Sequence, residues 1–154
     1  MDNAVLAREH GTLRKQLTSS AVCRRELLNL CKDYKVSLLL VFGSFARREN
    51  HSYSDLDLAY QRGNRFSFDE RYEFLSKLRE LLDVDYQYID LIWLNGADPL
   101  HLKKIVEDAI LLAGRKDTFK EFARMAFHRY SDYKPYLERE KTVNHRRIQR
   151  LKST

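Results

Sequence analysis

The sequence predicts an α/β or α+β domain, in which helices and strands alternate around one small β-sheet. Amphipathic helical patterns alternate with short apolar runs over most of the 154 residues. Hydrophobic residues make up 44% of the chain and aromatic residues 12%, a composition that indicates a globular protein and excludes a disordered one. At this length we expect a single domain with a sizeable core.

The first elements are expected to be two helices. Residues 3–17 carry leucines along one side, and residues 18–20, Thr-Ser-Ser, offer a cap for an amphipathic helix over Ala21–Tyr34. Cys23 and Cys31 both lie in this second helix, eight residues apart, which is too far for a disulfide. We therefore expect both thiols to be small core residues.

The next stretch predicts two strands joined through a glycine turn. Leu38–Phe42 is an unbroken apolar run, typical of a strand that is buried on both faces. It ends at Gly43-Ser44, after which we expect a short helix over Phe45–Arg48. A loop over residues 50–54 then leads to a second strand over Ser54–Tyr60.

A capping box predicts the start of the following helix. Ser67 stands at the cap and Glu70 three residues later, so the helix should run to about Leu82. The residues expected to face the core are Tyr72, Leu75, Leu78 and Leu82.

The last third of the domain contains one strand and two helices. Tyr86–Trp93 is an apolar strand, and Asp98-Pro99 is a cap followed by proline in the first turn of a helix. The run Ala109–Ala113 fits either the end of that helix or a short strand. Thr118–Tyr133 predicts a final helix, which Pro135 should bend or restart.

The net charge of +6 is concentrated at the C-terminal end. Residues 114–154 contain 12 Lys or Arg against 5 Asp or Glu, whereas residues 1–113 contain 16 against 17. We therefore divide the chain into a domain over residues 1–134 and a basic tail or helix over residues 135–154. Such a tail fits an acidic partner, a nucleic-acid backbone or simply a solvated helix surface, and these interpretations stay open.

Three carboxylates mark a candidate catalytic site. Asp55 and Asp57 alternate along the second strand and so share one face, where their charges repel each other unless a cation lies between them. Asp90 is a single carboxylate inside an apolar strand, which is costly to bury without a partner. If the two strands are neighbours, the three side chains form a cluster that can hold two metal ions; alternatively, Asp55 and Asp57 are the solvent side of an edge strand.

The glycine turn before these carboxylates favours the catalytic interpretation. Gly43 permits a tight backbone there, and the Ser44 hydroxyl and the following amides can bind an anion. A phosphate site next to paired carboxylates suggests a divalent metal that also binds a nucleoside triphosphate.

Gly43-Ser44, ten residues, Asp55-x-Asp57 and then Asp90 resemble the signature of the DNA polymerase β-like nucleotidyltransferase superfamily. Within it, the chain is similar to the minimal nucleotidyltransferases, the MNT or MntA group paired with HEPN toxins. The resemblance covers about residues 20–133. It implies a nucleotidyltransferase fold, with a mixed sheet that has helices on one face and an active site open on the other.

The resemblance also implies a mechanism. Asp55, Asp57 and Asp90 would hold two Mg²⁺ ions, and Asp90 would accept or relay the proton of the attacking hydroxyl. Gly43 and Ser44 would bind the phosphates of ATP. Arg47 would add positive charge there, although a plain surface arginine explains it equally well.

Three functions are compatible with this site. The resemblance implies an antitoxin that transfers AMP from ATP to a hydroxyl, expected to be a tyrosine, of a partner HEPN ribonuclease. The alternatives are an antitoxin that acts by stoichiometric contact, and an enzyme that modifies a small molecule such as an aminoglycoside. We expect a cytoplasmic protein with no membrane contact, because no apolar run approaches ~20 residues and the N-terminus resembles no signal peptide. Direct binding of nucleic acid is not expected.

Overall fold

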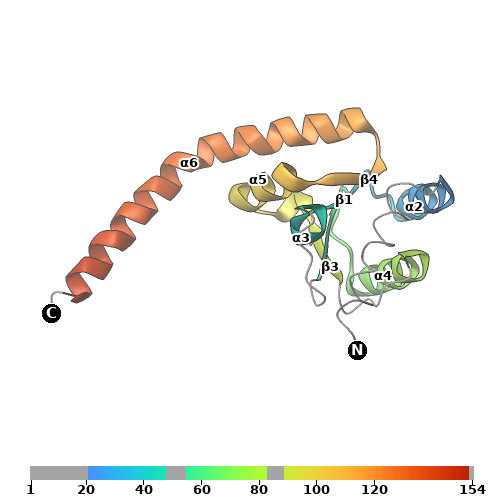
Figure 1. Ribbon diagram of the computed structural model, residues 1–154, viewed down its shortest axis with the longest axis horizontal. Helices are drawn as coiled ribbons and strands as arrows, with labels where there is room; N and C mark the ends of the chain where they lie inside the picture. Colours follow the sequence, from blue (N-terminus) through green and yellow to red (C-terminus); the bar gives the residue numbers. More distant parts are fainter. Residues whose placement is uncertain (1–20, 48–54, 83–88, 153–154) are drawn as a thin grey trace.

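A mixed four-stranded sheet forms the centre of the molecule. The computed structural model describes residues 21–47, 55–82 and 89–152 (Figure 1). The strand order is β3-β2-β1-β4, with β2 and β3 parallel and the other two pairs antiparallel. The strands are β1 (Leu38–Val41), β2 (Leu56–Gln61), β3 (Ile89–Trp93) and β4 (Ile110–Gly114). The predicted fold class, a small mixed sheet with helices, is confirmed.

Strand β1 lies inside the sheet and is buried on both faces, as its apolar run predicts. Leu39 and Val41 belong to one hydrophobic core, and Leu38 and Leu40 belong to another. Each of these side chains is at most 1% exposed. Because successive side chains of a strand point to opposite faces, both faces of the sheet need a covering layer.

Helices α2 (Ala21–Asp33) and α4 (Phe68–Leu82) cover the first face. The predicted capping box of α4 is present: Ser67 N donates to Glu70 Oε2 (2.8 Å), and Glu70 N donates to Ser67 Oγ (3.2 Å). The expected core face is partly wrong. Tyr72 is 62% exposed, and the buried residues are Phe74, Leu78 and Leu82, whose spacing of four places them on one side of the helix.

Helices α5 (Pro99–Asp108) and α6 (Lys116–Lys152) cover the second face, with the short helix α3 (Gly43–Arg47) beside them (Figure 1). Their core residues are Leu102 and Ile105 of α5 and Phe122 and Ala126 of α6. The implied arrangement with helices on one face is therefore corrected to helices on both faces. The physical reason is the doubly buried strand β1.

The chain after Asp108 settles the open alternative at residues 109–113. Ile110–Gly114 forms strand β4, antiparallel to β1. Helix α6 begins two residues before the predicted start and continues through Pro135 to Lys152, so it crosses the predicted domain boundary without a break. Proline lacks the N–H that a helix uses, and α6 curves along its length (Figure 1).

Some predictions lie outside the described residues: the helix over residues 3–17, the loop over residues 50–54 and the first part of the strand predicted from Tyr86. Cys31 is buried as expected, whereas the side chain of Cys23 is outside the described part. Within residues 21–47, 55–82 and 89–152, the helices are too short or too polar to cross a bilayer.

Candidate active site

The turn at Gly43 ends strand β1 and begins helix α3. Gly43 has φ +70°, a left-handed conformation that glycine adopts without steric cost. A Cβ added at this position would overlap Asp57 Oδ2 and lie 3.2 Å from Asp57 Cγ. The backbone also joins the two segments, because Phe42 N donates to Asp57 O (3.0 Å). The glycine thus lets the Gly-Ser turn pack directly against the Asp57 carboxylate.

The carboxylates come from two neighbouring strands, as the sequence requires for a cluster. Strands β2 and β3 are parallel, and Asp57 and Asp90 are partners in their register. Asp55 precedes β2 directly and is exposed, as is Asp90, while Asp57 is partly buried. Since Leu56 and Leu58 pack with the α2/α4 core, Asp57 points to the other face of the sheet.

The electrostatics of the site centre on Asp57. Burial raises the pKa of the Asp57 carboxyl above its ordinary value, and the negative charges of Asp90 and Asp55 raise it further. The positive charges of Arg47 and His101 act in the opposite direction. Asp55 and Asp90 are therefore close enough to Asp57 for their negative charges to act on its carboxylate.

A divalent ion with oxygen ligands fits the chemistry of these side chains, because carboxylates are the ligands that Mg²⁺ prefers. Among the described residues, however, no three His, Cys, Asp or Glu side chains are gathered closely enough to form a metal site. Two features therefore favour Mg²⁺ at this site: the carboxylate ligands and the negative charges that act on the Asp57 carboxylate.

Helix α5 supplies two residues that the sequence analysis did not single out. The guanidinium of Arg47 forms an ion pair with Asp108, at the end of α5. His101, in the first turn of α5, packs edge-on against the ring of Phe42, with the ring centroids 6.4 Å apart. Asp98 caps this turn by accepting a bond from His101 N (3.0 Å), as the cap prediction requires.

The position of α5 beside α3 is a tertiary feature, which explains why these residues were missed. The Asp98-Pro99 cap predicts the helix and hence the place of His101 in its first turn. No local pattern, however, indicates that the helix packs against the Gly-Ser turn. The shared core of Phe42, Leu102 and Ile105 brings the two together, along with the ion pair of Arg47 with Asp108.

Residues 25–118 match the family described as Polymerase beta, Nucleotidyltransferase. The chain belongs to this family. The protein adenylyltransferase MntA of Shewanella oneidensis is 28% identical over 100 residues, which cover 64% of this chain and 70% of the relative. The protein MJ0126 of Methanocaldococcus jannaschii is 29% identical over 90 residues, which cover 58% of this chain and 89% of the relative.

Solved structures of toxin–antitoxin complexes share the fold. A chain of a toxin–antitoxin structure with AMP-PNP matches with a TM-score of 0.61 and 24% identity, covering 82% of this chain and 98% of that chain. A structure described as a tri-AMPylated Shewanella oneidensis HEPN toxin in complex with MNT antitoxin matches with a TM-score of 0.57 and 22% identity, covering 83% and 97%. The nucleotidyltransferase fold expected from the Gly-Ser and Asp-x-Asp motif is confirmed.

Proposed function

We propose that this protein is an antitoxin that transfers AMP from ATP to a tyrosine hydroxyl of a HEPN-type partner and thereby neutralises it. The observation that carries the proposal is the packing of the Gly43 turn on Asp57, with Asp90 as the register partner of Asp57. Membership of the nucleotidyltransferase family supports the reaction type. The relative named as a protein adenylyltransferase and the structure with an AMPylated HEPN toxin support the acceptor.

Asp55, Asp57 and Asp90 are assigned to the binding of two Mg²⁺ ions. When bound, these ions supply charge stabilisation to the attacking and leaving oxygens of an in-line displacement. The assignment is supported by the negative charges of Asp55 and Asp90, which act on the Asp57 carboxylate and which a cation would offset. Asp55 and Asp90 are exposed, so their side chains are accessible to a metal–nucleotide complex.

The rest of the mechanism uses the chain's own groups. The Ser44 hydroxyl and the amides of the Gly43 turn bind the β- and γ-phosphates. Asp90 accepts the proton of the tyrosine hydroxyl, whose oxygen then bonds to the α-phosphorus while the bond to the pyrophosphate oxygen breaks. Arg47 adds positive charge beside the triphosphate, and its ion pair with Asp108 orients the guanidinium.

The test is the combined substitution of Asp55→Ala and Asp57→Ala. The variant, a HEPN-type partner, ATP and Mg²⁺ are incubated, and intact mass spectrometry counts the AMP groups on the partner. We expect AMP addition with the wild-type chain and none with the variant. A matched control replaces two exposed carboxylates remote from the site, Asp69→Ala with Asp117→Ala, and should transfer AMP normally.

The same experiment separates the alternatives. AMP transfer that persists in the double variant would rule out the assigned residues. A variant without transfer that still neutralises the toxin at equal dose would identify an antitoxin that acts by contact alone. Transfer of AMP to an aminoglycoside, but not to the protein, would identify a small-molecule enzyme.

A further inference from the structure

The end of helix α6 extends from the body of the molecule as an exposed segment, here called the α6 arm and defined as Glu138–Leu151 (Figure 1). Every residue of the arm is exposed. Contacts within the helix include the bond from Thr142 Oγ1 to Glu138 O (2.9 Å). The arm continues a helix whose first half is packed in the core, so it presents its exposed side chains on an ordered backbone.

The apolar side of the arm continues the side that packs in the core. Phe122 and Ala126 are buried against α5 and the sheet, and Leu137, about three turns later on the same side, is partly buried. Ile148 and Leu151 extend this stripe, yet they are 51% and 73% exposed. A helix side that is buried in its first half and exposed in its second half is typical of an interaction surface.

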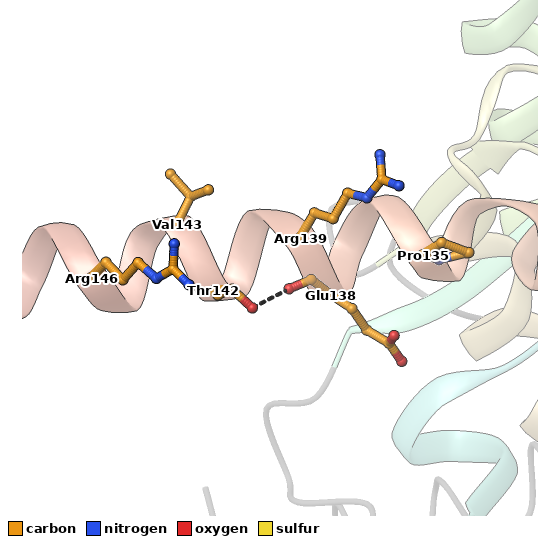
Figure 2. Close-up of a pocket in the computed structure, with 6 residues that line it drawn as sticks. All are labelled: Pro135, Glu138, Arg139, Thr142, Val143 and Arg146. Atoms are coloured by element: carbon orange, nitrogen blue, oxygen red, sulfur yellow. Dashed lines mark hydrogen bonds between the residues drawn. The ribbon is translucent and has the colours of Figure 1, made fainter.

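A second stripe of the arm is basic. Arg139, Val143, Arg146 and Arg150 follow one another at intervals of four, three and four residues, which places them on one side of the helix. Figure 2 shows Arg139 and Val143 on the same side of α6. The shallow hollow along this side is lined by Pro135, Glu138, Arg139, Thr142, Val143 and Arg146.

The chemistry of the arm distinguishes between three possible occupants. A second copy of the arm is disfavoured because each arm carries five Lys or Arg against two Glu, and equal charges repel. Nucleic acid fits the arginines but offers aliphatic side chains such as Ile148 and Leu151 no stacking surface. The two stripes lie on opposite sides of the helix, because Arg139 is two residues from Leu137 and Arg146 is two residues from Ile148. A protein with a cleft that encloses the arm, with an apolar wall on one side and an acidic wall on the other, matches both stripes.

We propose that the α6 arm docks the protein that receives AMP, in a cleft of that partner with one apolar wall and one acidic wall. This inference rests on the proposed function for the identity of the partner. The position of the arm supports the proposal. The first half of α6 covers the face of the sheet to which Asp57 points, and it packs on α5, the helix that carries His101. The arm therefore continues from the helical layer on the same face of the sheet as the Asp57 carboxylate.

The test reverses three charges on the arm: Arg139→Glu, Arg146→Glu and Arg150→Glu in the full-length chain. The matched control reverses three exposed charges of helix α2: Arg24→Glu, Arg25→Glu and Lys32→Glu. Isothermal titration calorimetry without ATP measures the Kd for the HEPN-type partner, and intact mass measures AMP transfer over a range of partner concentrations. A melting curve confirms that both variants fold.

We expect the arm variant to bind about tenfold more weakly, with a higher KM for the partner and an unchanged kcat at saturation. The α2 control should bind as the wild type does. Equal binding by the arm variant, or equal weakening by the control, would overturn the proposal. The proposal would also be overturned if the arm variant kept its affinity for the partner but lost an affinity of the wild type for a fluorescent RNA duplex. Loss of a wild-type dimer in light scattering, again with partner binding intact, would overturn it as well. Absence of AMP transfer by the wild type would refute the proposed function alone, because the calorimetry measures docking separately.

Discussion

The substitution Gly43→Ala tests the geometry on which the candidate site depends. Gly43 has φ +70°, and its α-carbon faces the Asp57 carboxylate. The new methyl group would lie well inside 3.0 Å of Asp57 Oδ2, closer than real Cβ atoms approach other atoms. The Asp57 backbone cannot easily retreat, because its carbonyl accepts the bond from Phe42 N and its strand lies between β1 and β3.

Two effects add in this variant. An L-residue in the left-handed region costs roughly 1–2 kcal/mol. For a chain of this size, that corresponds to a fall in Tm of about 2–8 °C. In addition, the Asp57 carboxylate must move by about 1 Å, and a misplacement of that size in a catalytic group costs about a hundredfold in rate. We therefore expect a folded protein of slightly reduced stability that has lost nearly all AMP transfer.

Gly63 offers a matched control in the same chain. A Cβ at Gly63 would meet no atom within 4 Å, so Gly63→Ala should leave both stability and transfer close to the wild type. Urea unfolding gives the free energy of unfolding, and intact mass of the HEPN-type partner gives the transfer rate. If Gly43→Ala transferred AMP at the wild-type rate, the close packing of the turn on Asp57 would not be a requirement of the site.

Three further predictions concern single side chains. Asp57→Asn should raise the Tm measured without metal and abolish any rise in Tm on addition of Mg²⁺. Burial and the charge of Asp90 raise the pKa of the Asp57 carboxyl, so the stabilising contribution of its protonated form is present below about pH 4 and is lost as the pH rises. The Tm advantage of the variant over the wild type should therefore grow from about pH 4 to 7. Glu70→Gln should lower the Tm at neutral pH, and the difference should vanish as the pH falls from 4.5 to about 2, since the hydrogen bond from Arg62 lowers the pKa of Glu70 to about 2. Burial raises the pKa of the Cys31 thiol to about 12, so mass mapping should find Cys31 unmodified by a thiol reagent at pH 8 in the folded protein and modified in urea.

The features that the sequence predicted well are those fixed by neighbouring residues. The capping boxes and caps at Ser67 and Asp98 have the expected hydrogen bonds, because a cap involves only residues three positions apart. The adjacency of the strands with Asp57 and Asp90 was also anticipated, since a carboxylate inside an apolar strand needs a polar surrounding.

The features that it missed depend on contacts between distant segments. The strand at residues 109–113 depends on a distant partner, because β4 pairs with the edge of β1 that β2 leaves open. The ion pair of Arg47 with Asp108 joins residues 61 positions apart, and no local pattern encodes it. The spacing of Tyr72 suits the core side of a helix, but Phe74 occupies the side that faces the sheet and Tyr72 is exposed.

The core of the protein also explains why the two motifs meet. Strand β1 pairs with β2 in the register Val41↔Leu58, and the pairing continues to Phe42, whose N–H binds the carbonyl of Asp57. Leu56 and Leu58 are buried in the α2/α4 core, at 4% and 0% exposure, and this burial fixes the register. A slip by one residue would move Asp57 into that core in place of a leucine, and a carboxylate is costly to bury there without a partner. The same hydrophobic pattern that stabilises the sheet therefore holds the Asp57 carboxylate against the Gly43 turn.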